Sequence, residues 1–201
     1  MPSQADFPDR MKLILASASP RRHELLAAVD LEFEVIPSPA EEIHDSTMAM
    51  ADLCEENARL KAVAISTQYP EAAVIGADTL VFLDGDALGK PKTPDEATSM
   101  LRRLSGETHQ VCTGVCIAGP GASLKTFHCV TDVLFRELDE PTISNYLAIV
   151  NPLDKAGGYG IQDHGEMVIS GIEGSYENVM GLPVDLVLEA LLGIGLPING
   201  R

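Results

Sequence analysis

Short apolar runs alternate with amphipathic stretches along most of this chain. The run from Lys12 to Ala16 has the length and composition of a buried strand, and the Ser19-Pro20 pair after it is typical of a helix start. Two long runs rich in β-forming residues, joined by a glycine-containing loop, occupy the middle of the chain and predict a β-ribbon. The predicted strands cover about residues 12–16, 33–36, 73–77, 79–83, 108–117, 124–136 and 167–172. One predicted helix begins at residue 20, and four more cover about residues 48–68, 94–104, 140–149 and 183–192.

This order of elements predicts an α/β fold, in which helices flank a mixed β-sheet and polar turns gather around a cleft. With 201 residues, 45% of them hydrophobic, the chain suits one domain with two lobes. We expect that domain over residues 12–196, with loose tails over residues 1–11 and 197–201. The first ten residues are polar and lack the apolar segment of a secretory signal.

The net charge of −16 limits the partners that this chain can have. So acidic a surface repels nucleic-acid backbones and anionic membranes, and no apolar run approaches the roughly 18 residues of a membrane span. We therefore expect neither a nucleic-acid partner nor a membrane partner. An anionic ligand would have to bind at a local basic pocket, which draws attention to the few clustered cations.

The four cysteines form neither a zinc motif nor a disulfide framework. Cys112 and Cys116 are four residues apart in a predicted strand, hence on one face, while Cys54 and Cys129 are isolated in the sequence. We expect free thiols and a cytoplasmic protein. The five histidines show no paired-ligand spacing, so each is expected to be structural or solvated.

Polar residues interrupt the apolar strands at residues 17–22, 76–79 and 89–92. The first segment places Arg21 and Arg22 in the first turn of a helix, where like charge opposes the helix dipole. Both arginines make sense if an anion binds there to free N–H groups and guanidinium groups; the alternative is that both point into water. The second segment places Asp78 at the expected end of a strand, where a carboxylate can hold a metal or orient water.

The third segment, Gly89-Lys90-Pro91, superficially resembles a phosphate-binding P-loop. Three residues rather than four separate Gly85 from Gly89, and Pro91 stands where the metal-binding hydroxyl would be, so a P-loop kinase is disfavoured. Lys90 remains a cation on a stiff turn, suited to pairing with an anion.

Eight motifs in order along the chain resemble one known family. They are ASASPRRHELL, the Glu41-Glu42 pair, LKAVA, IGADTLV, LGKPKTPDEA, LSGETHQVCTGV, PLDKAGGYGIQ and GSYENVMGLP. By these motifs the chain resembles, from Lys12 to Leu192, the Maf family of septum-formation-inhibitor-like nucleoside triphosphate pyrophosphatases. The resemblance implies a fold similar to that of the inosine triphosphate pyrophosphatases, an active cleft between two lobes, and a homodimer. It also implies cleavage of a nucleoside triphosphate to the monophosphate and pyrophosphate with a divalent cation, Mg²⁺ or Mn²⁺.

The resemblance also assigns roles to residues. The aspartate of the GAD motif, Asp78, matches the general base, and Glu42 matches the acidic loop residue that would share a metal with it. The adjacent Glu41 could exchange roles with Glu42. The candidate substrate-binding residues, from the resemblance and from the phosphate cradle together, are Ser17, Ser19, Arg21, Arg22, Lys61, Thr79, Lys90 and Gln162.

Within the family, GADT together with YGIQ resembles the subgroup that acts on thymidine and uridine triphosphates. The specificity positions correspond to Arg21, Thr79 and Gln162. A glutamine amide can bond to both the N3–H and a carbonyl of uracil or thymine. Asp163 stands where the family usually has glycine, and it adds a charge near the expected base pocket.

Two other functions are compatible with the same phosphate cradle. A nucleotidyltransferase or phosphotransferase would bind the same triphosphate, but it would need an acceptor rather than water. A nucleotide-binding regulator of cell division would bind the same nucleotide, with catalysis only incidental to its role. Products formed in the absence of an acceptor, and the cellular effect of an Asp78→Asn protein, distinguish these alternatives.

Overall fold

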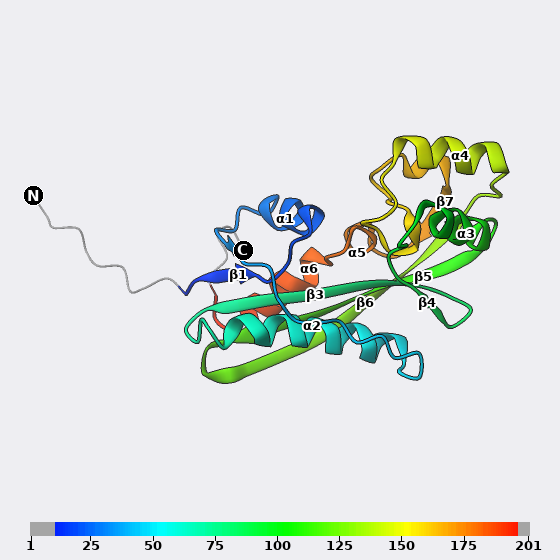
Figure 1. The fold of residues 1–201 in the computed structure, drawn as a ribbon. Coiled ribbons are helices and arrows are strands. Elements are labelled where there is room, and N and C mark those ends of the chain that lie inside the picture. The colour runs from blue at the N-terminus through cyan, green and yellow to red at the C-terminus, as the bar shows by residue number, and fades with distance from the viewer. Residues whose placement is uncertain (1–10, 197–201) are drawn as a thin grey trace, which may run out of the picture.

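The computed structural model describes residues 11–196 and shows one twisted sheet with helices on both faces (Figure 1). The strands are β1 (Leu13–Leu15), β2 (Glu34–Val35), β3 (Ala73–Leu83), β4 (Asp86–Leu88), β5 (Thr108–Gly119), β6 (Ser123–Phe135) and β7 (Ile169–Glu173). The helices are α1 (Pro20–Ala27), α2 (Met50–Ser66), α3 (Pro94–Leu104), α4 (Glu140–Ile149), α5 (Tyr176–Met180) and α6 (Val184–Gly193). Short 3₁₀ turns occur at Pro120–Ala122, Ala156–Gly158 and Gly165–Met167.

The sheet is mixed, as the sequence predicts. Its strand order is β2-β1-β3-β5-β6-β7, and β4 pairs with β3. β1 runs parallel to β2 and β3, whereas β3, β5, β6 and β7 pair antiparallel in succession. The long β5–β6 hairpin is the β-ribbon expected in the middle of the chain. α1 connects the parallel strands β1 and β2, so its first turn lies at the carboxyl end of β1.

Alternate residues of β3 belong to different cores, because successive strand side chains point to opposite faces. On one face, Ala73, Ile75 and Ala77 pack on α1 and α6. Further along the same face, Val81 and Leu83 pack on α3 and α4. These two clusters form the two lobes that the sequence predicts, and α1 and α4 lie at separate ends of Figure 1. The opposite face packs on α2, and its two clusters contain Val74, Leu80 and Phe82.

α2 lies unusually close to the sheet, and two glycines permit this approach. A Cβ atom added to Gly76 would collide with the backbone of Ala58, and one added to Gly114 would collide with the backbone of Cys54. The close approach lets side chains of α2 reach the middle of β3. It also brings the Cys54 thiol within 3.5 Å of the carbonyl oxygen of Cys112, to which it donates, so Cys54 is not isolated in the fold.

The structure corrects the sequence prediction in two places. β3 runs unbroken from Ala73 to Leu83, so Asp78 lies in the middle of a strand and residues 76–79 are not a turn. The five-residue helix α5 was not predicted. The four cysteines are free thiols, as expected. Of the predicted tails, residues 1–10 and 197–201 lie outside the described residues, whereas Met11 packs against the core near α1 and α6. Within residues 11–196, no helix is long and apolar enough to cross a membrane.

Candidate active site

A cavity of about 560 Å³ lies along the one stretch of β3 that lacks a strand neighbour on one edge. β1 pairs with β3 only over Ala73–Ile75, and β4 pairs with it over Val81–Leu83. Within the described chain, residues 76–80 therefore have a partner, β5, on the other edge alone. The cavity can be lined from both faces of the sheet at this point. Asp78 and Thr79, consecutive residues that point to opposite faces, both line it.

Asp78 points toward α2, where two side chains bind its carboxylate. Lys61 Nζ lies 2.7 Å from Oδ1, and Asn57 Nδ2 donates to Oδ2 over 3.1 Å. Asn57 is fixed in turn, because its side chain pairs with both the N–H and the C=O of Ile43. Lys61 Nζ also lies 2.7 Å from Glu42 Oε1, so one ammonium joins two carboxylates. Lys61 is thus no solvated lysine: its side chain is 12% exposed.

This environment keeps Asp78 ionised. Burial by itself raises the pKa of Asp78, since a carboxylate is poorly solvated there. The Lys61 ammonium, the Arg22 guanidinium and the Asn57 amide outweigh burial and together hold the pKa below its usual value. A carboxylate that is buried yet ionised, on the wall of a cavity, has the properties of a functional group rather than a packing residue.

Asp78 and Glu42 also fit the requirements of a hard divalent cation. Residues 11–196 contain no cluster of three or more histidine, cysteine, aspartate or glutamate side chains that could hold a metal by themselves. Mg²⁺ is commonly bound by one or two carboxylates together with water and substrate phosphates. The pair of carboxylates on Lys61 supplies that number of protein ligands. Of the adjacent glutamates, Glu42 makes the contact with Lys61 and lines the cavity.

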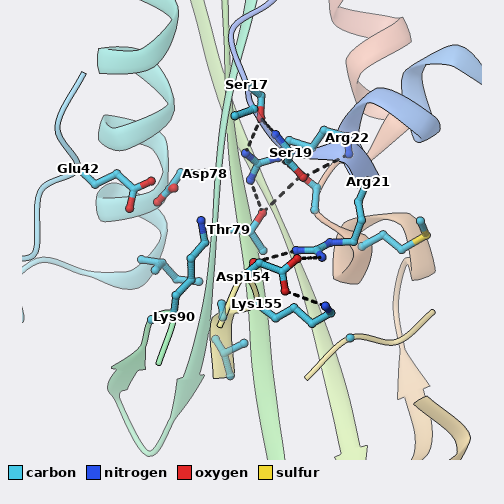
Figure 2. A pocket seen from close by; sticks show the side chains of 18 of the residues that line it. Ser17, Ser19, Arg21, Arg22, Glu42, Asp78, Thr79, Lys90, Asp154 and Lys155 are labelled. Atoms are coloured by element: carbon cyan, nitrogen blue, oxygen red, sulfur yellow. Dashed lines mark hydrogen bonds and ion pairs between the residues drawn. The ribbon is translucent and has the colours of Figure 1, made fainter. Parts of the chain in front are cut away.

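On the other face of β3, Thr79 belongs to a hydrogen-bond network of hydroxyl and carbonyl groups that is anchored by the Arg22 guanidinium. Arg22 is buried, and its Nε donates to the Gly181 carbonyl over 2.8 Å, Nη1 to Ser17 Oγ over 3.3 Å, and Nη2 to Thr79 Oγ1 over 2.9 Å. Figure 2 shows Arg22, Ser17 and Thr79 on one side of the strand and Asp78 with Glu42 on the other. The sequence places Arg22 in a phosphate cradle, whereas in the structure all three of its donor atoms bind protein oxygens.

The amino end of α1 has the predicted cap. Ser19 Oγ accepts from the Arg22 N–H over 3.5 Å, and the Ser19 N–H donates to Ser17 Oγ over 3.2 Å. Arg21 points away from α1 to the loop before the 3₁₀ turn at Ala156–Gly158, where it binds the Asp154 carboxylate and carbonyl over 3.4 and 3.2 Å. Arg21 does not simply point into water: its side chain is 21% exposed and lines the cavity.

Lys90 follows β4 and lines the cavity with an exposed side chain. Its ammonium group points to the space between Asp78 and Thr79 in Figure 2. Within residues 11–196, neither Lys90 nor Lys92 forms an ion pair. A cation aimed at a cavity without a protein counter-ion is available for an anionic ligand.

Gln162 lines the far side of the cavity, exposed, on the loop after the 3₁₀ turn. The neighbouring Asp163, which the sequence marks as an unusual charge, lies 3.1 Å from Lys155 Nζ. Lys155 is buried and also binds Asp154 Oδ1 over 2.8 Å and the Asn151 carbonyl over 2.8 Å. The charge of Asp163 is therefore paired, and Lys155 connects the Gln162 loop to the Asp154 carboxylate that holds Arg21.

All ten residues that the sequence nominates line or border one cavity, and three further residues support them. Asn57 orients Asp78, Lys155 pairs with Asp163, and Thr113 bonds to Thr79 over 2.9 Å. Lys155 lies inside the PLDKAGGYGIQ motif, which gave a signal for it. Thr113 lies inside the LSGETHQVCTGV motif, but nothing in that motif links it to Thr79, 34 residues away. Asn57 lies outside all eight motifs, 21 residues from Asp78.

The chain is similar to known proteins over nearly its whole length. The family model described as Maf-like protein matches residues 12–194. A dTTP/UTP pyrophosphatase of Akkermansia muciniphila is 49% identical over 183 residues, which cover 91% of this chain and 96% of that protein. A dTTP/UTP pyrophosphatase of Moorella thermoacetica is 46% identical, with 94% and 98% covered. Among solved structures, the Staphylococcus aureus Ham1 protein has a TM-score of 0.55 at 16% identity, with 90% of this chain and 98% of that chain covered, which shows a shared fold.

Proposed function

This chain belongs to the Maf-like protein family, and we propose that it hydrolyses dTTP and UTP to the nucleoside monophosphate and pyrophosphate with a divalent cation. The family match and the relatives named dTTP/UTP pyrophosphatase over nearly the whole chain support this reaction. The observation that carries the proposal is the carboxylate of Asp78, buried but held ionised by Lys61, on the wall of a cavity lined by cations.

In the proposed reaction, one water molecule is consumed and the bond that links the α- and β-phosphoryl groups breaks. Asp78 orients the attacking water and accepts its proton, for which the carboxylate has to be ionised before the reaction begins. Its second oxygen stays bound to the Asn57 amide, which fixes the plane of the carboxylate. The released pyrophosphate carries the charge of two phosphoryl groups, so positive groups nearby stabilise the departing anion.

Of the cationic side chains that line the cavity, three come from separate parts of the chain and are the proposed phosphate ligands: Arg21 from α1, Lys61 from α2 and Lys90 from the loop after β4. Lys90 has no ionic partner within residues 11–196, so phosphate binding there breaks no existing ion pair. Arg21 is held by Asp154 and Lys61 by two carboxylates, so both are positioned in advance. We propose that Ser17 and Ser19, at the open amino end of α1, contribute polar groups to the same triphosphate site.

Asp78 and Glu42 would hold the divalent cation, Mg²⁺ or Mn²⁺. Bound there, such an ion supplies positive charge to the phosphate oxygens and makes the attacking water more acidic. Lys61 would then have to share the two carboxylates with it. Its flexible side chain and strongly hydrated ammonium suit such an exchange of partners.

We propose that Thr79 and Gln162, with Arg21 nearby, recognise the nucleobase and select uracil or thymine. The charge of Asp163 does not oppose this choice, since Lys155 pairs with it. We further propose a single catalytic domain over residues 12–196, a cytoplasmic location and a homodimer, with nucleic acid and membranes not among its partners. Light scattering on the purified protein tests the dimer.

The proposed function is tested by incubating the protein with a panel of canonical and modified nucleoside triphosphates, with and without a chelator, and separating the products. We expect equimolar monophosphate and pyrophosphate from UTP and dTTP with water as the only acceptor, and no release in excess chelator. Release of inorganic phosphate, or dependence on an added acceptor, would contradict the proposal and favour a phosphatase or a transferase. Binding of nucleotides without turnover would favour a regulatory role.

A further inference from the structure

The hydroxyl group of Thr79 is surrounded by protein partners that determine what it can offer to a ligand. Arg22 Nη2 lies 2.9 Å away, Thr113 Oγ1 2.9 Å and the Gly181 carbonyl oxygen 3.4 Å. A guanidinium nitrogen can only donate, so Arg22 occupies one of the two lone pairs of Thr79 Oγ1. One lone pair and one proton remain to be assigned.

Thr113 decides that assignment. It lies directly opposite Thr79 in the β3–β5 register, has no exposed surface, and donates from Oγ1 to the Asn178 carbonyl oxygen over 3.1 Å. A hydroxyl has one proton, so a Thr113 that donates to Asn178 must accept from Thr79. In the reverse arrangement Thr113 would donate to Thr79, and Thr79 would donate over 3.4 Å to Gly181, whose oxygen already accepts from Arg22 Nε at 2.8 Å. The shorter contacts favour the first arrangement, and in neither does Thr79 keep a free proton.

We infer that Thr113 is a specificity-determining positioning residue: it takes the proton of Thr79, so that Thr79 presents an acceptor and no donor to the cavity. Thr113 has no contact with the cavity itself, and it acts through Thr79 alone. The inference rests on the proposed function, and it explains how a hydroxyl, which ordinarily adapts to either partner, can discriminate between bases.

The surroundings of Thr79 suit a nucleobase. On its face of β3 the cavity is lined by apolar side chains from three elements and loops: Val81, Val111, Tyr159, Val179 and Met180. The Asp78 face carries the Glu42 and Lys61 charges, whereas on the Thr79 side the Arg22 guanidinium binds protein oxygens and Arg21 pairs with Asp154 (Figure 2). An ionised phosphate oxygen can only accept hydrogen bonds, so it is a poor partner for an acceptor-only Thr79. The group that meets Thr79 has to donate.

Uracil and thymine carry a donor at N3–H, whereas cytosine has an acceptor at N3. An acceptor-only hydroxyl therefore bonds to uracil and thymine. With cytosine, a lone pair of Thr79 Oγ1 faces the lone pair of N3, and neither atom has a hydrogen-bond partner. Adenine, with an acceptor at N1, is rejected for the same reason. Guanine has a donor at N1–H, so its rejection depends on size alone. The inference thus predicts two different mechanisms of discrimination in one pocket.

The test compares kcat/KM for UTP, CTP and GTP in the wild type and in Thr113→Val, Thr113→Ser and Thr131→Val proteins. Thr113→Val removes the hydroxyl with little change of shape, and the Asn178 carbonyl keeps the Gly181 N–H at 2.9 Å. We expect the UTP:CTP ratio to narrow about tenfold or more and the UTP:GTP ratio to change less than about twofold. Thr113→Ser keeps the hydroxyl that accepts from Thr79, so it should keep the wild-type ratios. Thr131→Val removes a buried hydroxyl that contacts Ser175 and the Asn178 side chain but not Thr79, so it controls for a general disturbance around Asn178 and should also keep the ratios.

The same substitution in a Thr79→Val background shows whether Thr113 acts through Thr79. We expect Thr113→Val to change the UTP:CTP ratio no further there; an equal narrowing in that background would overturn the inference in favour of a packing effect. An unchanged ratio in folded Thr113→Val protein would also overturn it. If wild-type protein releases no pyrophosphate from UTP, the proposed function itself fails, which is a separate and distinguishable result.

A second measurement needs no variant and covers the case in which Thr113→Val fails to fold. N3-methyl-UTP lacks the donor that Thr79 is inferred to accept, whereas 5-methyl-UTP keeps it. In wild-type protein we expect kcat/KM to fall at least about tenfold for the N3-methyl compound and to stay within about threefold of UTP for the 5-methyl compound. Equal rates on N3-methyl-UTP and UTP would overturn the inference.

Discussion

Two consecutive residues of β3 face two different environments. Asp78 lies among charges, with Lys61 Nζ at 2.7 Å and Glu42 on the same ammonium. Thr79, on the other face, bonds through its hydroxyl to the Thr113 hydroxyl, the Gly181 carbonyl and the buried Arg22, which is the one charged group that this hydroxyl contacts within residues 11–196. The alternation of a strand thus places on opposite faces the groups that we propose act on phosphate and water and the groups that we propose distinguish donors from acceptors. Both reach one cavity because β3 has an open edge there.

The largest expected effect comes from Asp78→Asn, which removes the base while nearly keeping its shape. We expect kcat to fall at least about a hundredfold, as is typical of a general base. Steady-state pyrophosphate release measures it. Asp86→Asn is the matched control, because Asp86 forms an exposed ion pair with Arg103 away from the cavity lining, and its rate should stay within about twofold of wild type. Near-normal turnover by a folded Asp78→Asn protein would refute the assignment.

Lys61→Met removes the ammonium that keeps Asp78 ionised. Burial, which raises the pKa of Asp78, is then opposed by Arg22 and Asn57 but no longer by Lys61, so this pKa rises relative to wild type. A general base with a raised pKa becomes protonated at a higher pH, so the acid limb of the kcat/KM profile should shift toward higher pH by about one pH unit or more. Transition-state stabilisation should also fall by about 1.5–3 kcal/mol, the scale of a charged hydrogen bond. An unchanged acid limb would show that Lys61 does not control Asp78.

The low pKa of Asp78 also contributes to stability in wild-type protein. Since the folded pKa lies below the unfolded value, this contribution is present above about pH 4 and is lost as the pH falls through the folded pKa. The free energy of unfolding of Asp78→Asn should therefore be lower than that of wild type above about pH 4, and it should fall less steeply below that pH. Urea titrations at several pH values measure the difference.

Arg21→Ala and Lys90→Ala should each weaken catalysis, and Lys90→Ala should do so without changing the UTP:CTP ratio. We expect a loss of about 1.5–3 kcal/mol in kcat/KM for each, because both cations lie at the cavity and can bind phosphate. Arg103→Ala, on the surface, is the control and should change stability by no more than about 0.5 kcal/mol and kinetics not at all. If both cavity variants keep wild-type kinetics, the phosphate-binding role is wrong.

The smallest expected effect lies beneath the Thr79 face. His109 is buried, with Nε2 2.6 Å from Tyr159 Oη, and burial lowers its pKa to about 4. The unfolded chain binds this proton near pH 6.5, so acidification favours the unfolded state, and stability falls by less than about 1 kcal/mol between pH 7 and pH 6. His109→Gln should remove that slope. If wild type and His109→Gln show the same pH dependence of the free energy of unfolding, the role of His109 is wrong. His109→Gln should leave the UTP:CTP ratio unchanged.

The sequence predicts the elements whose apolar periodicity is long enough to be distinctive, such as α2, α3, α4 and the β5–β6 hairpin. It fails at residues 76–79, because Asp78 and Thr79 look like a turn between apolar runs. They remain in a strand because partners on α1, α2 and β5 bind their side chains, and these contacts span 17 residues or more of sequence. α5, with five residues, is too short to show a helical period.

The candidate site was predictable as a set of motifs but not as a geometry. Asp78, Lys61 and Lys90 are separated along the chain, and the family resemblance is what joins them. The sequence gives no reason for Lys61 to bind two carboxylates, nor for Arg22 to face Thr79 instead of phosphate. Both depend on how closely α2 and α1 approach β3, which Gly76 and Gly114 allow for α2.

One measurement tests most directly whether the two faces of β3 have separate tasks: kcat/KM for UTP and CTP in wild-type, Asp78→Asn and Thr113→Val proteins, determined side by side. The account predicts that Asp78→Asn lowers both values by the same factor, about a hundredfold or more, and keeps their ratio. It predicts that Thr113→Val changes the ratio about tenfold or more. A UTP:CTP ratio that collapses in Asp78→Asn, or that stays at the wild-type value in Thr113→Val, would contradict the separation.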